Sequence, residues 1–378
     1  MTLGMAQVSR AFCPNIHTLV LAMSELSEDE KWMHEALAEA KNGIGLTAPN
    51  PPVGAVIVKD GVKLASGWHR KVGVNHAERD ALSQLSKVEG RIVEAEGATI
   101  YVTLEPCSTQ GRTGSCTDAL IKAKFARVVY AMDDPNPDHV GRSQHLLEEE
   151  GIEVTTGILR EEAAYLIRGF TMVQQYQRPW VIAKTAMSLD GRITRPPGEG
   201  QWLTGPQSRE KVQQLRAEVE AIITSGETLR KDNPALTLRS KGVLNEKEQP
   251  VRVVITRSEI KYENYQMFTD EYRDRTQVFQ NKGLDKVLQQ LAKQGHNTVL
   301  LECGGELMGA FLDAELIDEM VIFFAPIITG GPQPALAGEG VESLKDRLLL
   351  KETSVQEIGS DLCLHGLIDR ERLRKLER

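Results

Sequence analysis

The 378-residue sequence predicts an α/β protein of two or three domains. Short apolar runs typical of buried strands alternate along the chain with amphipathic helical segments, which favours central, largely parallel sheets covered by helices. The alternation pauses at the polar segment 177–179 and then begins again. We therefore expect an N-terminal extension at 1–23, a first domain at 24–176 and a second domain at 177–378.

The first helix has the clearest boundaries in the first half. Ser27 and Glu30 have the spacing of a capping box, and Gly43 stops the helix. The Asp60-Gly61 turn predicts a hairpin between two strands. The pattern predicts strands at 53–58, 62–66, 98–104, 127–131 and 152–155, and further helices at about 76–85, 117–123, after 141 and at 160–176.

The second half repeats the alternation of strands and helices. The pattern predicts strands at 180–186, 221–225, 251–256, 298–301 and 319–325, with helices from about 206, near 285–294 and from about 306. Two polar stretches, 240–250 and 258–283, are expected to be surface loops.

The composition limits the classes of function. Hydrophobic residues make up 41% and charged residues 26%, which is an ordinary soluble balance. The net charge of −8 argues against a chain held mainly by nucleic-acid phosphates. No apolar run reaches the roughly 18 to 20 residues that a membrane-spanning helix needs. Five cysteines are an odd number and sparse for this length, so we expect no disulfide framework and a reducing cytoplasm.

Four residues indicate a catalytic metal site. His76, Cys107 and Cys116 offer three ligands for a tetrahedral zinc, which leaves the fourth position for water. Glu78 lies two residues beyond His76, where a carboxylate moves protons without binding the metal. A structural zinc is the alternative, with His69 as the fourth ligand, or the thiols are unrelated. Glu78 favours catalysis because a closed structural site has no use for it.

The spacing of these residues has a geometric reason. His76 is expected at the start of one helix and Cys116 at the start of the next, while Pro106 ends a strand and places Cys107 at the mouth of the sheet. The helix dipole favours a thiolate at such a position. Zinc lowers the pKa of bound water from about 15.7 towards 7. A His-x-Glu…Pro-Cys…Cys arrangement is described for zinc deaminases of nucleobases, so we expect ammonia release from an aminopyrimidine.

At these residues the first half resembles the cytidine deaminase superfamily, which implies a three-layer α/β/α domain. Eight residues separate Cys107 from Cys116, and this gap contains Gly-Arg-Thr. Such a gap is similar to the deaminase half of bifunctional riboflavin-biosynthesis enzymes. The same is true of the motifs Pro-Asn-Pro-Pro-Val-Gly at 49–54, Gly-Trp-His at 67–69 and Asp-Pro-Asn-Pro at 134–137.

The resemblance also implies substrate contacts in the first half. Two are asparagines in turns, Asn50 in the Pro-Asn-Pro turn and Asn136 in the Asp-Pro-Asn-Pro turn. The others are His69, which precedes the metal-binding His, and Arg112, the basic residue between the two thiols. The structural alternatives are turn-forming Asn residues, a satisfied His and a solvated Arg. The chain departs from the family at Thr109, where His is common, and at Gly114-Ser115, which replaces Pro-Pro.

Three loops in the second half resemble the reductase half of the same enzymes, which implies a dihydrofolate-reductase-like fold and NADPH. The residues implied along the cofactor are Ala186, Trp202, Thr228, Asp232, Gly304, Gly305 and Glu306. The residues implied along the substrate are Arg216, Leu236, Arg239 and Glu302. The paired glycines alone are weak evidence for a phosphate-binding loop, because glycine is also common in ordinary turns. Surface ion pairing is the alternative for the two arginines. Gly200 replaces a Ser common in the family.

These observations predict a two-step enzyme of riboflavin biosynthesis. The first half would deaminate 2,5-diamino-6-(5-phosphoribosylamino)pyrimidin-4(3H)-one with zinc, and the second would reduce the ribosyl group of the resulting uracil to ribityl with NADPH. We expect a small-molecule substrate and a homo-oligomer, either a dimer or a tetramer, as the family often forms. One alternative is a tRNA base deaminase with an accessory domain, and another is a zinc-stabilised binding module without catalysis.

Overall fold

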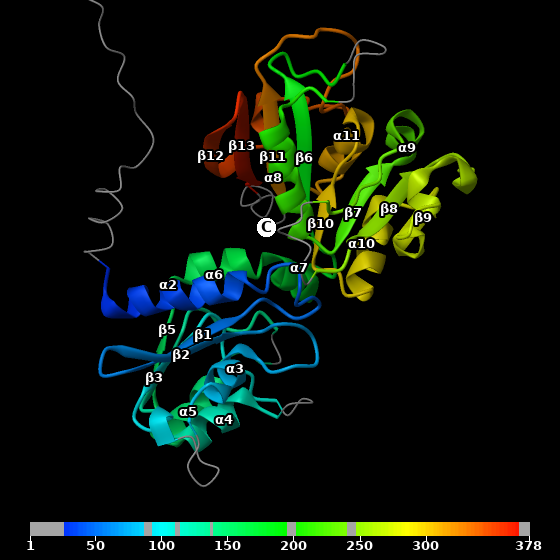
Figure 1. The fold of residues 1–378 in the computed structure, drawn as a ribbon. Coiled ribbons are helices and arrows are strands. Elements are labelled where there is room, and N and C mark those ends of the chain that lie inside the picture. Colours follow the sequence, from blue (N-terminus) through cyan, green and yellow to red (C-terminus); the bar gives the residue numbers. More distant parts are fainter. Residues whose placement is uncertain are drawn as a thin grey trace, which may run out of the picture.

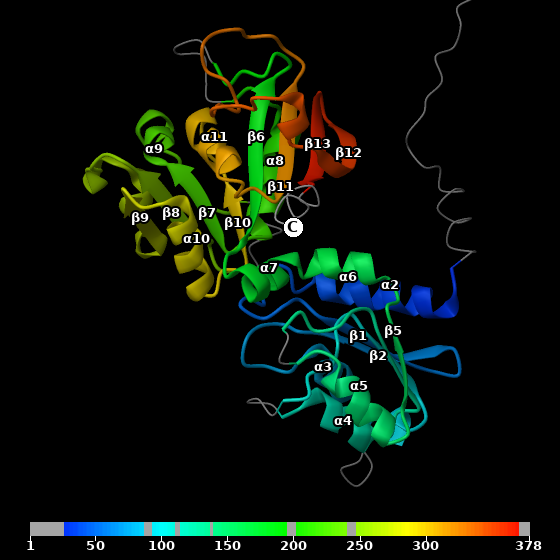
Figure 2. The same ribbon diagram turned by 180° about the vertical axis from the view of Figure 1, so that it is seen from behind.

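The computed structural model describes residues 26–86, 93–109, 114–136, 139–194, 202–239 and 247–369. Its strands form two separate sheets, one in each half of the chain. The two halves lie one above the other in Figure 1, and the helices that follow the first sheet lie at their junction (Figures 1 and 2). The expected N-terminal extension, 1–23, lies outside the described residues.

The first half is a five-stranded sheet in the order β2, β1, β3, β4, β5 between two layers of helices. Helices α2 and α6 cover one face and α3, α4 and α5 the other, as their separate apolar clusters and Figure 1 show. Its elements are α2 (Glu28–Lys41), β1 (Gly54–Lys59), β2 (Val62–Trp68), α3 (Ala77–Ser83), β3 (Thr99–Val102), α4 (Cys116–Ala123), β4 (Arg127–Tyr130), α5 (Arg142–Glu149), β5 (Glu153–Thr156) and α6 (Arg160–Leu166). This is the three-layer α/β/α arrangement that the sequence predicts.

Local signals in this half formed as expected, with two differences. The capping box at α2 is present, with Ser27 accepting from the Glu30 amide and Glu30 accepting from the Ser27 amide. The sheet is less parallel than expected, because β1 runs antiparallel to both β2 and β3, and only β3, β4 and β5 are parallel. The expected connecting helix is broken at Ile167, so α6 is followed by a separate α7 (Arg168–Tyr176).

The second half is an eight-stranded sheet in the order β12, β13, β11, β6, β10, β7, β8, β9. It is parallel from β11 to β9 and antiparallel at β13 and β12. Its elements are β6 (Trp180–Ser188), α8 (Pro206–Ala217), β7 (Ala221–Ser225), α9 (Gly226–Asp232), β8 (Val251–Thr256), β9 (Thr276–Gln280), α10 (Leu284–Lys293), β10 (Thr298–Leu301), α11 (Gly305–Asp313), β11 (Glu319–Ala325), β12 (Leu350–Ile358) and β13 (Asp361–Ile368). Helices α8 and α9 pack on one face, and α10 and α11 on the other.

The structure corrects the expectation of a loop over 258–283. This stretch contains short 3-10 turns and the strand β9. Its polar sequence reflects its place at the edge of the sheet, where side chains are largely solvated. Among the described residues, no helix combines the length and the apolar character that crossing a membrane requires.

Candidate active sites

The three predicted metal ligands converge at the ends of three elements. His76 is the N-cap of α3, Cys116 opens α4, and Cys107 lies in the loop after β3. The Nδ1 atom of His76 lies 3.5 Å from the Sγ atoms of both Cys107 and Cys116. All three donor atoms lie within 4.8 Å of one another. One nitrogen and two sulfurs at this spacing fit a zinc ion.

The two thiols shift each other's pKa in opposite directions. A hydrogen bond with Cys116 lowers the pKa of the Cys107 thiol, and His76 lowers it further. The same bond, together with burial, raises the pKa of the Cys116 thiol. A bound dication would favour deprotonation of both thiols, as a thiolate ligand set requires.

His69 does not complete a closed zinc site. Its Nε2 atom lies 3.1 Å from the Asn50 amide nitrogen, and its Nδ1 atom lies 3.0 Å from the Asn75 carbonyl oxygen. Both ring nitrogens are therefore engaged away from the metal ligands. Within the described part of the chain, the candidate metal group consists of His76, Cys107 and Cys116 alone. This donor set leaves one coordination position open.

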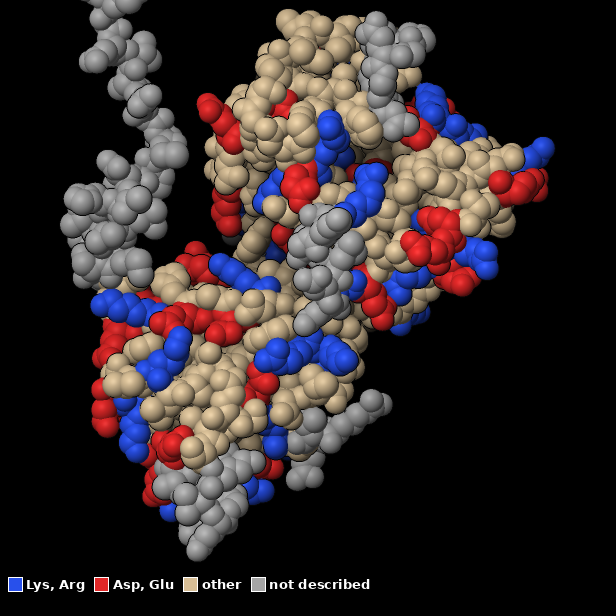
Figure 3. All heavy atoms as spheres, viewed as in Figure 1, with Lys and Arg blue, Asp and Glu red and all other residues tan. Residues whose placement is uncertain are grey.

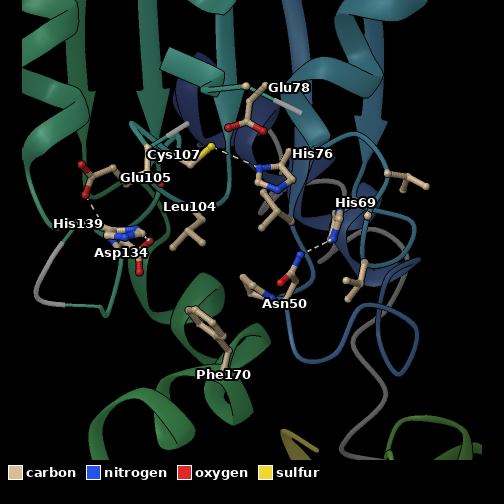
Figure 4. A pocket seen from close by; sticks show the side chains of 17 residues that line it. Asn50, His69, His76, Glu78, Leu104, Glu105, Cys107, Asp134, His139 and Phe170 are labelled. Carbon is tan, nitrogen blue, oxygen red and sulfur yellow. Dashed lines mark hydrogen bonds and ion pairs between the residues drawn. The ribbon is translucent and has the colours of Figure 1, made fainter. Parts of the chain in front are cut away.

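Glu78 lines a cavity of about 400 Å³ together with His76 and Cys107. Its side chain is buried, with 3% of the residue exposed, and burial raises its pKa. Figure 4 shows Glu78, His76 and Cys107 at one end of the cavity and Asn50 and Phe170 at the other. The cavity is lined by Asn50, Pro51, Val53, His69, Val72, Gly73, Val74, His76, Glu78, Leu104, Glu105, Cys107, Thr109, Gly114, Asp134, His139 and Phe170.

The expected substrate residues of the first half are only partly brought together. Asn50 and His69 contact each other and line the cavity. Asn136 lies in the nearby loop, where its amide donates to the Asp134 carboxylate at 2.9 Å, but it is not among the lining residues. Arg112 lies outside the described residues.

Both departures from the family motif in the first half have a place in the structure, whereas Gly200, the departure in the second half, lies outside the described residues. Thr109 and Gly114 line the cavity. Gly114 has a φ of +75°, which a proline cannot adopt, and Ser115 caps α4 by accepting from the Asp118 amide at 3.1 Å. Gly114 and Ser115 therefore shape the turn into α4, which begins at the candidate ligand Cys116.

Several cavity residues were missed by the sequence reasoning. Glu105 holds the loop that follows β4, because its carboxylate accepts from the amides of Asp134, Gly141 and Ser143 at 3.0 to 3.2 Å. His139 pairs with Asp134 at 3.4 Å. The Asp-Pro-Asn-Pro motif at 134–137 indicated that this loop is part of the site, although it did not indicate these two residues. Phe170 had no local signal, because an aromatic residue on an amphipathic helix usually belongs to the core.

The second site centres on a buried charged group. Arg216 donates to the Glu302 carboxylate at 2.7 and 3.2 Å, and Lys184 donates to it at 3.2 Å. Burial alone would raise the pKa of Glu302, but the two cations lower it to about 2. Arg216 therefore is not a solvated surface group. It also donates to the Thr237 carbonyl at 3.1 Å, which links it to the loop that carries Leu236 and Arg239.

That loop is held by side chains from the surrounding elements. Gln249 exchanges two hydrogen bonds with the Leu238 backbone, and Gln213 accepts from the Arg239 amide at 2.7 Å. Leu236 is buried and has a φ of +49°, a conformation that is unfavourable for leucine. A strained backbone held this firmly is common in binding sites.

The expected cofactor residues lie on the same half. Thr228 accepts from the Gly304 amide at 3.1 Å, so this amide is already engaged. Gly305 is required by packing, because a Cβ there would lie 2.2 Å from the Pro334 carbonyl oxygen. Trp202 is 60% exposed, with the Arg209 guanidinium 4.7 Å from its ring centre. The remaining predicted positions are Ala186 on β6, Asp232 at the end of α9 and Glu306 in the first turn of α11.

The paired glycines fit an anionic cofactor group at the start of α11. Gly304 is the N-cap, and the space that a side chain would fill there is open to 3.8 Å. The helix N-terminus favours negative charge, such as the phosphates of NADPH. The Gly304 amide already donates to Thr228, so it is not free to bind a phosphate. The case for an anionic group therefore depends on the helix N-terminus and on the open space beside Gly304.

Comparisons with known proteins cover both halves. Residues 26–132 match the cytidine and deoxycytidylate deaminase zinc-binding region, and residues 179–364 match the RibD C-terminal domain. The riboflavin biosynthesis protein RibD of Escherichia coli is 39% identical over 89% of this chain and 99% of its own. RibD of Bacillus amyloliquefaciens is 35% identical over 90% of this chain and 96% of its own.

Solved structures agree with the sequence relatives. Acinetobacter baumannii RibD has a TM-score of 0.82 and 36% identity, covering 90% of this chain and 99% of its own. A diaminohydroxyphosphoribosylaminopyrimidine deaminase/5-amino-6-(5-phosphoribosylamino)uracil reductase from Thermotoga maritima has a TM-score of 0.77 and 31% identity, with the same coverage. The expected fold class of both halves is thereby confirmed. The chain belongs to the RibD family of riboflavin biosynthesis proteins.

Proposed function

We propose that this chain carries out two consecutive steps of riboflavin biosynthesis. The first is the zinc-dependent deamination of 2,5-diamino-6-(5-phosphoribosylamino)pyrimidin-4(3H)-one. The second is the NADPH-dependent reduction of the ribosyl group of 5-amino-6-(5-phosphoribosylamino)uracil to ribityl. The observation that carries the proposal is the open cluster of His76, Cys107 and Cys116 beside the buried Glu78, on one chain with the RibD reductase half.

The chain's own residues divide the deamination between them. Zinc, when bound, lowers the pKa of a water molecule so that a nucleophile is available at neutral pH. His76, Cys107 and Cys116 are the proposed ligands, and Glu78 is the proposed proton carrier from water to the leaving amine. Asn50, His69, Arg112 and Asn136 are the proposed substrate contacts. The close Asn50–His69 contact at the cavity wall supports the first two.

The reductase step depends on position and charge. NADPH, when bound, would supply a hydride for C1′ of the opened ribose. We assign Arg216, Leu236, Arg239 and Glu302 to the substrate, and Ala186, Trp202, Thr228, Asp232, Gly304, Gly305 and Glu306 to the cofactor. The hydrogen-bonded link from Glu302 through Arg216 to the 236–239 loop supports a single substrate site.

A tRNA base deaminase with an accessory domain is the alternative reading. The RibD relatives favour the small-molecule reading, and the net charge of −8 argues against a polyanionic substrate. On the face drawn in Figure 3, Lys and Arg are interspersed with Asp and Glu. The test is turnover of the phosphoribosyl pyrimidine, with the product identified by mass spectrometry, beside an equal concentration of tRNA. Deamination of tRNA in place of the pyrimidine would overturn the proposal.

A homo-oligomer, either a dimer or a tetramer, is part of the proposal. Strand β12 lies at the edge of the second sheet and is exposed along most of its length. Large apolar side chains are exposed on this strand, at Val355, and shortly before it, at Leu344 and Leu349. An edge strand with such neighbours favours pairing with a second copy. Light scattering on the purified chain should give a multiple of 41.9 kDa, and a monomer mass would contradict it.

The location and the domain boundaries remain proposals too. We place the enzyme in the cytoplasm, because its sparse cysteines suit a reducing compartment.

We place the boundary between the two domains at 176/177, with an extension at 1–23. The end of α7 at Tyr176 and the start of β6 at Trp180 support this boundary. Limited proteolysis that released fragments ending near residue 176 would agree with it.

A further inference from the structure

Two walls of the deaminase cavity come from segments that contact the second half of the chain. One wall is the turn that carries Asn50, and the other is helix α7, which carries Phe170. Figure 4 shows Phe170 pointing from its helix toward the cavity, on the same side as Asn50 and opposite Glu78. The apolar faces of Phe170 and Leu104 suit a flat pyrimidine ring.

Helix α7 lies directly against the reductase half. A Cβ on Gly169 would lie 2.4 Å from the Thr298 Oγ1 atom and 2.8 Å from the Asn297 carbonyl oxygen, so only glycine permits this approach. Just before Gly169, the Arg168 Nε atom donates to the Glu319 carboxylate on β11 at 3.0 Å. Both partners are largely buried, with side-chain exposures of 14% and 3%. The helix at Phe170, the next residue, is therefore anchored to the second half, while the Phe170 ring packs against the core of the first half.

The Asn50 turn is held by the same reductase segment. The Asn297 side-chain amide donates to the Pro49 carbonyl at 3.0 Å. Gly295 lies against the Pro49 ring, and a Cβ there would be 3.5 Å from its Cδ atom. Pro49 precedes Asn50, whose amide contacts His69. Movement of Pro49 would therefore shift Asn50 and disturb its contact with His69.

The segment Asn297-Thr298 is itself rigid. The Glu220 carboxylate accepts from the amides of Asn297 and Thr298 at 3.0 and 2.7 Å, and the Asn297 carbonyl accepts from the Trp180 amide at 2.9 Å. Asn297 is buried, with 6% of the residue exposed. One fixed segment of the reductase half thus touches both walls of the deaminase cavity.

We propose that the reductase half positions the substrate pocket of the deaminase through Asn297, with Phe170 as a specificity-determining wall of that pocket. This inference rests on the proposed deaminase function of the cavity. Asn297 is a positioning residue, because it acts through Pro49 and Asn50. Its removal should weaken substrate binding and leave the metal ligands and Glu78 in place.

The test uses full-length variants and measures ammonia release. Asn297→Ala and Phe170→Ala should each raise KM by about five- to tenfold, with kcat within about twofold of the parent and zinc content unchanged. Phe170→Tyr should restore KM because it keeps the aromatic face. Asn264→Ala, an exposed asparagine in the same half, is the matched control and should behave as the parent.

The reductase reaction of the same variants separates the outcomes. Reduction of already deaminated substrate should be unchanged in Asn297→Ala, which shows that its sheet is intact. Unchanged KM for ammonia release in both alanine variants would overturn the inference. The inference would also be overturned if the alanine variants lost zinc or thermal stability in proportion to their loss of activity. A parent chain that released no ammonia would instead refute the proposed function on which the inference depends.

Discussion

Replacing Glu78 with glutamine should lower ammonia release by about 10² to 10⁴-fold and leave the zinc content unchanged. Glutamine keeps the size of the side chain but accepts no proton from water and gives none to the leaving amine. The change should fall on kcat, because Glu78 acts on the reacting atoms and the cavity walls stay in place. Steady-state kinetics and metal analysis of the same preparation measure both quantities.

The control is Glu35→Gln, on the exposed face of α2. Glu35 forms a surface ion pair with Lys63, and both side chains are 45% exposed. Such pairs contribute little to stability, so this variant should match the parent. Glu78→Gln with full deaminase activity would contradict the catalytic assignment and favour a zinc-stabilised binding module.

Replacing Glu302 with glutamine should abolish the reductase activity and lower the free energy of unfolding by about 3 to 5 kcal/mol. The variant leaves the Arg216 and Lys184 cations buried without their carboxylate. Arg216 also loses the partner that holds it beside the Thr237 carbonyl, so the 236–239 loop, which carries proposed substrate residues, loses support. NADPH oxidation with deaminated substrate and denaturant unfolding measure the two effects.

The stability effect of this variant should depend on pH. The pKa of Glu302 is lowered in the folded state from an ordinary 4.5 to about 2. Its stabilising contribution is therefore complete above the unfolded value and is lost as the pH falls through the folded value. The difference between parent and variant should shrink as the pH falls from 4.5 toward 2.

A surface glutamate on the same half provides the control. Glu227 pairs with Arg230 and Lys231 and is 52% exposed, so Glu227→Gln should change stability by less than about 1 kcal/mol. Equal destabilisation by Glu302→Gln and Glu227→Gln would show that the buried group does not hold the reductase site.

The sequence predicted those features that depend on short-range patterns. The capping box at Ser27, the hairpin at Asp60-Gly61 and the placement of His76 and Cys116 at helix starts all follow from local spacing. The meeting of His76, Cys107 and Cys116 was predictable because the two helix starts and the strand end that carry them lie at the same edge of a sheet.

Features set by long-range packing were missed. No strand was expected after residue 325, although β12 and β13 lie there, because β12 is an exposed edge strand with a mostly polar sequence. Phe170 was missed because the wall it forms depends on contacts of Arg168 and Gly169 with residues more than a hundred positions away in the sequence. The contact between Asn297 and Pro49 has no sequence signal, since it spans 248 positions.

The order of the two reactions tests the central claim most directly. The full chain should be incubated with the diaminopyrimidine phosphate, with and without NADPH, before and after zinc removal. Ammonia should appear without NADPH, and NADPH oxidation should follow deamination. The zinc-depleted chain should oxidise NADPH only when deaminated substrate is supplied. Oxidation of NADPH by the zinc-depleted chain with the original diamino substrate would contradict the proposed sequence of steps.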